Sequence, residues 1–434
     1  MDGEFRKVGL ISCTALVLAN MIGTGVFTFL GYQVAALPSP FLVLLVWALG
    51  GLIALCGALS YAELAAALPK SGGEYNFLSQ IYHPALGFMA GFVSVAVGFA
   101  APIALSGMAF GKYLEGTGVG VTAFGASLGV VLALAVIHSV TVRASGNFQI
   151  GVTTLKVSLI VVFVLMGLWI ERKLPHNFAP RPEDAGLLVS PSFAVSLMFV
   201  LYAYTGWNAA AYIIGEVRNP QRTVPWALLL ATGLVTVLYV SLNAVFLAAA
   251  PIQEYVDKIE VGEIAARHLL GEEGGRIMSG LISLGLISAI SAMTWAGPRV
   301  TQSIGRDFRV LGFLSKTTKG GVPRVALFFQ TSIVLFMLLT SSFEDVLFYA
   351  QFAILASSFL TVLGVIVLRW RQPALPRPFR CFGYPFTPIV YLALNLFALV
   401  YSAVAHPIQA VAGLGTLLLG IALYFLFRNR KVSV

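Results

Sequence analysis

Charge is scarce in this chain, because Asp, Glu, Lys and Arg make up only 10% of its 434 residues. Soluble domains contain about 25% of these four residues. No long polar stretch interrupts the chain, so no soluble domain is expected beside the apolar part. The scarcity of charge therefore excludes an ordinary water-soluble protein.

Cysteine is also rare, and its three copies are dispersed. Cys13, Cys56 and Cys381 form no CxxC pair, which argues against a disulfide framework or a thiolate zinc site. The five histidines show neither metal-ligand nor catalytic spacing. We therefore expect no metal, no cofactor and no catalytic residue.

Hydrophobic residues, in contrast, make up 58% of the chain and come in long runs. About 20 apolar residues in a helix are enough to cross the hydrocarbon core of a bilayer. The first run is interpreted as a retained helix, since no small-residue cleavage site follows a short apolar core. The runs predict an all-α integral membrane protein with twelve transmembrane helices. Their ranges are 8–36, 40–68, 84–111, 121–141, 148–170, 190–215, 223–250, 276–300, 323–341, 345–369, 385–405 and 408–427.

Basic residues concentrate in every second loop of this arrangement. A net charge of +9 would suggest nucleic acid as the partner of a soluble protein. Here the distribution follows the positive-inside rule, with Arg218, Arg324 and Arg377 on the same side as the N-terminus. We predict a multi-pass protein of the cell (inner) membrane with both termini cytoplasmic, in contact with lipid and not with nucleic acid.

Two of the predicted spans contain residues that interrupt a helix near mid-membrane. In the first span Gly23 and Gly25 flank Thr24, and in the sixth Thr205 precedes Gly206. Irregular backbone in a bilayer is tolerated only where it lines a cavity or binds something. The two spans open two possible five-helix halves, and breaks at matching positions predict a transporter site. The predicted site residues are Met21, Ile22, Gly23, Thr24, Gly25, Tyr202, Ala203, Thr205, Gly206, Trp207 and Asn208.

The chemistry of such breaks matches a zwitterionic α-amino acid. Free N–H groups at the start of a half-helix, here Thr24 and Gly25, favour a carboxylate, whereas free C=O groups at a half-helix end favour an ammonium. The competing interpretation is that these glycines only allow close helix packing; two breaks at matching positions favour the site. The carbonyls expected to accept hydrogen bonds from the ammonium are those of Met21, Tyr202, Ala203 and Thr205.

One ionisable side chain, Lys156, lies deep inside the fifth predicted span. An ammonium at that depth is costly unless it meets carbonyls or water, so it is expected to have partners. The expected partners are the carbonyl end of the first half-helix near Ile22 and the hydroxyls of Ser288 or Ser291. The alternative is a lysine that snorkels to an interface. Whether Lys156 stays charged or exchanges a proton is left open.

Four segments resemble the amino acid–polyamine–organocation (APC) family, and within it the branch of light-chain amino-acid transporters (LAT-like). They are residues 22–27 (IGTGVF), 60–75 (SYAELAAALPKSGGEY), 203–208 (AYTGWN) and 215–225 (GEVRNPQRTVP). The resemblance implies a five-plus-five inverted-repeat core of the LeuT type. Residues 1–172 then form the first repeat, 190–370 the inverted second repeat, and 384–428 two peripheral helices.

The same resemblance implies roles for single residues. The substrate carboxylate is expected on Thr24 and Gly25, Tyr202 forms an aromatic gate, and Lys156 stands where sodium-coupled relatives hold their second sodium ion. Two departures bear on specificity: Thr205 replaces the usual glycine, and no asparagine lies near Ser291. No extracellular cysteine is available for a disulfide to a heavy-chain subunit, so no such subunit is expected.

The predicted function is sodium-independent amino-acid transport by alternating access, with neutral L-amino acids favoured and exchange, facilitated diffusion and proton coupling open. A carrier of cationic amino acids or polyamines is the main alternative; Asn208 stands where some such relatives have Glu. A membrane-embedded enzyme is a remote alternative, because Lys156 lacks a catalytic partner, and no channel filter is present. One cluster, Glu63 and Glu74 with Lys70, Arg218 and Arg222, is either an inner-gate charge network or solvated charge.

Overall fold

A computed structural model describes residues 8–140, 146–170, 178–318 and 321–428, with only the backbone at 146–150, 152, 303 and 309. Within these ranges all regular secondary structure is helical, apart from one isolated bridge between Val8 and Val217. Nine helical segments are long and apolar enough to cross a membrane, and three shorter apolar helices, Thr153–Trp169, Pro191–Ala203 and Arg324–Thr340, accompany them. Each predicted range overlaps one of these segments.

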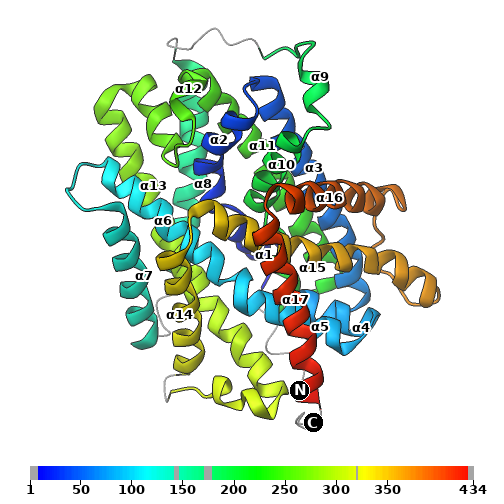
Figure 1. Cartoon of the computed structure of the whole chain (residues 1–434). Helices are drawn as coiled ribbons and strands as arrows, with labels where there is room; N and C mark the ends of the chain where they lie inside the picture. The colour runs from blue at the N-terminus through cyan, green and yellow to red at the C-terminus, as the bar shows by residue number, and fades with distance from the viewer. Residues whose placement is uncertain (1–7, 141–145, 171–177, 319–320, 429–434) are drawn as a thin grey trace.

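The long elements follow the predicted order along the chain, and Figure 1 shows how they are arranged. Six shorter elements connect them: α4 (Gly73–Ile81), α9 (Asp184–Leu187), α12 (Ile252–Tyr255), η2 (Ala209–Tyr212), η3 (Ile214–Glu216) and η4 (Arg309–Ser315). The long elements are α1 (Leu10–Met21), α2 (Gly25–Ala36), α3 (Pro40–Ala67), α5 (Pro84–Val93), η1 (Ser94–Gly98), α6 (Ala100–Gly116), α7 (Ala123–Val140), α8 (Gly146–Trp169), α10 (Pro191–Ala203), α11 (Pro220–Ala249), α13 (Val261–Asp307), α14 (Arg324–Thr340), α15 (Phe343–Arg371), α16 (Phe386–Ala405) and α17 (Pro407–Phe427).

Local sequence explains where several of these helices begin. Ser39 and Ser190 each accept a backbone N–H of the first turn, and each precedes a proline at the first helical position, where its fixed φ suits a helix start. The start of α15 has a complete capping box between Ser342 and Asp345. These caps satisfy N–H groups that the helices themselves leave unpaired.

Two spans differ from the prediction. The eighth was expected over 276–300, but α13 begins at Val261, bends at Gly271 (φ 82°) and continues to Asp307. Its first part was missed because it is polar, and the charge of Glu263 is satisfied by Arg267 and Ser279, each at 2.7 Å. The third span contains a π-helical turn, η1, and extends to Gly116. Such turns are frequent at functional sites.

The interior is built around α1, α2, α10 and α11, with α7 and α14 at one edge of the molecule (Figure 1). Gln33 links α2 to α3 and α10: its Oε1 accepts the indole N–H of Trp47 on α3 at 2.8 Å, and its Nε2 donates to the Ser196 carbonyl on α10. Tyr113 of α6 donates to the Phe27 carbonyl at 2.6 Å and accepts from the N–H of Gly262. Both side chains anchor the half-helix that follows the first break.

Candidate substrate site

The first predicted span is broken, as expected. Between α1 and α2 lie Ile22, Gly23 and Thr24, and α2 begins at Gly25. The Met21 carbonyl at the end of α1 accepts the hydroxyl of Tyr239 at 2.7 Å and the N–H of Gly23 at 2.9 Å. This carbonyl, expected to face an ammonium, is therefore already hydrogen-bonded within the protein.

The start of α2 carries unused donors. Within the described ranges no backbone or side-chain acceptor is bonded to the N–H groups of Thr24, Gly25 or Val26, and α2 has no side-chain cap. Orphan N–H groups at a helix start favour an anion, because the helix dipole adds to their own partial charges. This end of α2 has the chemistry of a carboxylate site.

The second break follows α10, which ends at Ala203, and the chain then continues through a turn into η2. Thr205 folds back onto the Tyr202 carbonyl through its N–H at 2.9 Å and its Oγ1 at 2.7 Å, so that carbonyl is engaged. The carbonyls of Ala203 and Thr205 accept no hydrogen bond within the described ranges. Of the carbonyls expected to face an ammonium, these two remain unused.

The two breaks contact each other at their glycines. A Cβ on Gly25 would lie 2.8 Å from the Cβ of Ala203, and a Cβ on Gly206 would lie 2.6 Å from the carbonyl oxygen of Asn20. Gly206 also has φ +94°, a conformation that side chains disfavour. Only glycine allows this approach, so the free groups of both breaks are held side by side.

Lys156 lies beside the first break. Its side chain is 4% exposed, and its Nζ donates to the Ile22 carbonyl at 3.3 Å. Its aliphatic stem packs against Gly285 of α13. The ammonium therefore meets the carbonyl end of α1, as the sequence predicted, and the side chain does not snorkel to an interface.

The two serines expected beside Lys156 have other roles. The hydroxyl of Ser291 is hydrogen-bonded to Nε2 of His138 at 2.8 Å, and that of Ser288 has no hydrogen-bond partner within the described residues. The prediction that either serine bonds Lys156 is therefore wrong. Ser291 is instead bonded to His138 of α7, a contact that the spacing of residues along α13 does not indicate.

Trp207 and Asn208 contact residues of α3 and α4. The Trp207 ring packs edge-on against Tyr61 of α3 at 4.6 Å, and Asn208 donates to the carboxylate of Glu74 at 3.4 Å. They line a cavity of about 50 Å³ among α3, α15 and α16, named here the rear cavity. Thr205 and Gly206 of the second break line the same cavity, so the place of all four residues in the substrate site stays a prediction.

Aromatic residues cover the candidate substrate site on the side toward the end of α2 and the start of α10. The Tyr202 ring meets the edge of Phe29 at 6.0 Å. Tyr32 is stacked between Phe199 at 5.4 Å and Phe343 at 5.7 Å, with rings within 8° of parallel. The gate expected at Tyr202 is thus part of a larger cluster contributed by α2, α10 and α15.

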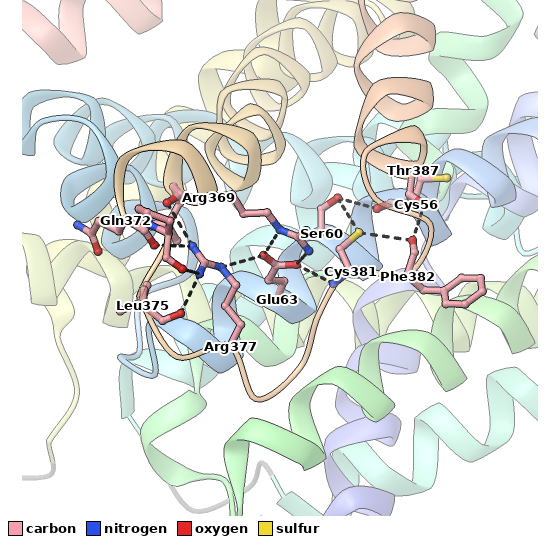
Figure 2. A network of polar contacts seen from close by, with 12 residues as sticks. Cys56, Ser60, Glu63, Arg369, Gln372, Leu375, Arg377, Cys381, Phe382 and Thr387 are labelled. Carbon is pink, nitrogen blue, oxygen red and sulfur yellow. Dashed lines mark hydrogen bonds and ion pairs between the residues drawn. The ribbon is translucent and has the colours of Figure 1, made fainter.

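The charge network near the other end differs from the prediction, as Figure 2 shows. Glu63 forms two hydrogen bonds with Arg369, at 2.6 and 2.8 Å, pairs with Arg377 at 3.3 Å, and accepts the N–H of Cys381 at 2.7 Å. Glu74 lies apart from it. In the described chain the partners of these two acids include none of the three basic residues that were expected there, Lys70, Arg218 and Arg222.

Comparison with known proteins decides the family. The family described as amino acid permease matches residues 8–427. The chain belongs to this family. It is therefore a multi-pass membrane transporter of the APC type whose function is amino-acid transport, and it is not an enzyme.

Individual relatives agree over nearly the whole chain. The human large neutral amino acids transporter small subunit 2 is 28% identical over 97% of this chain and 80% of its own length. The serine/threonine exchanger SteT of Bacillus subtilis (strain 168) is 28% identical over 100% of this chain and 99% of its own. The mouse Asc-type amino acid transporter 1 is 27% identical over 97% and 81%.

Proposed function

We propose that this permease carries neutral L-α-amino acids across the cell membrane by sodium-independent exchange. The observation that carries the proposal is the contact between the two breaks at Gly25 and Ala203. The N–H groups of Thr24 and Gly25 and the carbonyl of Ala203 form no hydrogen bond within the described ranges. A carboxylate on the first and an ammonium on the second is the arrangement that an α-amino acid fits.

The proposed architecture has twelve spans, both termini in the cytoplasm, and a five-plus-five inverted-repeat core. Residues 1–172 and 190–370 form the two repeats, and 384–428 form the peripheral pair. The two discontinuous spans, α1–α2 and α10 with η2, open the two repeats. Support comes from the nine long and three shorter apolar helices, and from α1 starting and α17 ending at the same end of the molecule (Figure 1).

Lys156 carries the proposal of sodium independence. A buried cation on the Ile22 carbonyl neutralises the negative end of α1, which would otherwise attract a metal ion. The side chain is held by a carbonyl and by Gly285, so it acts as a fixed charge during transport. Proton transfer by this lysine is the alternative.

Alternating access needs a closure on each side of the site. In this conformation the aromatic cluster of Tyr32, Phe199 and Phe343 covers the proposed outer path, and the loop carrying α12 docks on α2 through the N–H of Asp257 and the carbonyl of Gly31. Opening would separate α2 and α10 from the start of α15 while the contact between the breaks persists.

A carrier of cationic amino acids or polyamines is the second candidate. It would need an acid free to bind a second ammonium, whereas the carboxylate of Glu74, the buried acid that contacts the second break, already accepts three neutral donors. The relatives support neutral amino acids as the substrates, since one is named for large neutral amino acids and another for serine and threonine. The match with SteT over its full length supports a carrier without a second subunit.

The test uses purified protein in liposomes loaded with unlabelled amino acid, and uptake of a labelled panel is measured with and without a pH gradient. Strong stimulation by internal amino acid that needs neither a sodium gradient nor a proton gradient supports the proposal. Uptake that needs an imposed sodium or proton gradient, or that favours polyamines, contradicts it.

A further inference from the structure

The rear cavity has polar walls. Gln351 of α15 is 0% exposed, and neither its Oε1 nor its Nε2 has a hydrogen-bond partner in the described chain. Asn395 of α16 is equally buried, and its Oδ1 has no partner. Both residues line the cavity. Buried amides almost always have partners, and a polar space of this size accommodates a few water molecules.

The carboxyl group of Glu74 reaches this cavity from α4, the short helix between two spans. It is 6% exposed and accepts three neutral donors: the hydroxyl of Tyr61, the hydroxyl of Ser357 at 2.7 Å and the amide of Asn208 at 3.4 Å. None of its partners in the described chain is a cation. A buried carboxylate without a counter-charge is costly, even with good neutral donors.

The second buried acid of this region makes the contrast clear. Glu63 has two guanidinium partners, Arg369 and Arg377 (Figure 2). Glu74 has none among the described residues. The titratable groups around Glu74 are phenols: Tyr61 of α3, Tyr212 of η2 and Tyr391 of α16. From α15 it meets the uncharged Ser357. No lysine, arginine or histidine in the described chain affects its titration.

Electrostatics point in the same direction as the geometry. Burial raises the pKa of the Glu74 carboxyl, while the hydrogen bonds from Tyr61, Ser357 and Asn208 lower it without cancelling the effect of burial. The acid form is therefore favoured at a higher pH than for an exposed glutamate.

We propose that Glu74 and the rear cavity form a proton-binding site. Water in the cavity delivers the proton: a hydronium ion transfers H⁺ to a carboxylate oxygen, an O–H bond forms there, and water is left behind. The bound proton takes the place of the missing counter-charge. The unpartnered amides of Gln351 and Asn395 supply the polar walls that let water reach the carboxyl.

Protonation would change contacts made by three elements. The carboxylate receives hydrogen bonds from α3, from α15 and from the residue that follows the second break, Asn208. Its own segment is tied to η2 and η3 by the N–H of Gly72 and the hydroxyl of Ser71. A neutral acid accepts fewer bonds, so proton binding loosens the second break from α4. This consequence rests on the proposed transport function, whereas the proton site itself does not.

The site is tested by pH titration of the purified full-length protein, followed by the infrared C=O stretch of protonated carboxyl groups. We expect the Glu74 carboxyl to give a component of this band that stays protonated to higher pH than the exposed acids. It should disappear in Glu74→Gln and persist in the control Glu115→Gln, whose side chain is 49% exposed. A band that titrates unchanged in Glu74→Gln overturns the proposal.

A second variant covers the case in which Glu74→Gln does not fold. Gln351→Leu leaves the acid in place but makes the cavity wall apolar, so the titration of Glu74 should move to higher pH. An unmoved titration would contradict a role for the cavity.

Exchange measured against internal pH then tests the coupling. The wild type should show a pH dependence that is absent in Glu74→Gln, because glutamine resembles the neutral acid. Equal pH dependence in both proteins overturns the coupling. If the wild type exchanges no amino acid at any pH, the proposed transport function fails, while the infrared titration still decides the proton site.

Discussion

Gly206 lies directly against the backbone of Asn20, and this contact joins the two broken spans. A Cβ at position 206 would lie 2.6 Å from the Asn20 carbonyl oxygen, and the positive φ of Gly206 adds a second reason for glycine. The contact between Gly25 and Ala203 is equally close. The proposed site is thus a property of two breaks held together rather than of either break alone.

Replacing this glycine tests the contact. Gly206→Ala should reduce exchange at least tenfold and destabilise the fold by about 1–3 kcal/mol, because the backbone is strained and the two breaks must separate. Gly233→Ala is the matched control, since a Cβ there meets nothing within 4 Å and alanine improves a helix by about 0.5–1 kcal/mol. Thermal unfolding and exchange are measured for both. Full activity in Gly206→Ala would contradict the account.

Removing the buried cation tests its role at the first break. Lys156→Met deletes the hydrogen bond to the Ile22 carbonyl, which as a charge-assisted bond is worth about 1.5–3 kcal/mol. We expect exchange to fall about tenfold or more while the protein still folds, because the cost of burying the charge also disappears. Lys112→Met, at a side chain 47% exposed, should change neither. Unaltered exchange kinetics in Lys156→Met would remove the lysine from the mechanism.

The Glu63 network should be structural. Glu63→Gln leaves Arg369 and Arg377 without their shared carboxylate, and breaking a buried pair costs about 3–5 kcal/mol. Because Arg369 is partly exposed, the lower end of that range is expected. The melting temperature should fall clearly below that of Glu115→Gln, which breaks only a surface pair with Lys112. Equal melting temperatures would show that the network adds no stability.

The thiol of Cys381 should be unreactive in the folded protein. It lies in the loop before α16, where burial raises its pKa to about 12, and only the thiolate reacts with alkylating agents. Iodoacetamide at pH 8 should therefore leave this cysteine unmodified until the protein unfolds, as followed by mass spectrometry of its peptide. Rapid labelling of the native protein would contradict its burial.

The same thiol gives a stability prediction with a defined sign. Above its usual pKa of 9.0 an unfolded thiol loses its proton, whereas the folded one keeps it up to about 12. Unfolding then releases a proton, so this group lowers stability as pH rises through that window and has no effect below it.

The breaks were predictable because membrane burial makes them visible in sequence. A hydroxyl between glycines at mid-span, or Thr beside Gly among aromatics, has few roles other than a break, and the breaks lie at 22–24 and after 203. The partner of Lys156 was predictable for the same reason. A lone ammonium deep in the membrane needs carbonyl partners, and the end of the first half-helix has carbonyls that its own helix does not use.

Contacts between distant elements could not be read in this way. The partners of the second break depend on packing, so the contacts of Trp207 with Tyr61 and of Asn208 with Glu74 could not be predicted. Ser291 was expected to form a hydrogen bond with Lys156, but it is bonded to His138 of α7. No spacing rule relates positions 138 and 291. Glu63 pairs with Arg369 of α15 and Arg377 of the following loop, both more than three hundred residues away along the chain.

The central claim is tested most directly by competition for uptake between a transported amino acid and its close analogues. The account predicts that only molecules with both a free carboxylate and a free ammonium compete, and that the carboxamide and the decarboxylated amine lose about 100-fold or more in affinity, as expected from two lost charge-assisted hydrogen bonds. If the amine analogue competes as well as the amino acid, the free N–H groups of Thr24 and Gly25 do not hold a carboxylate.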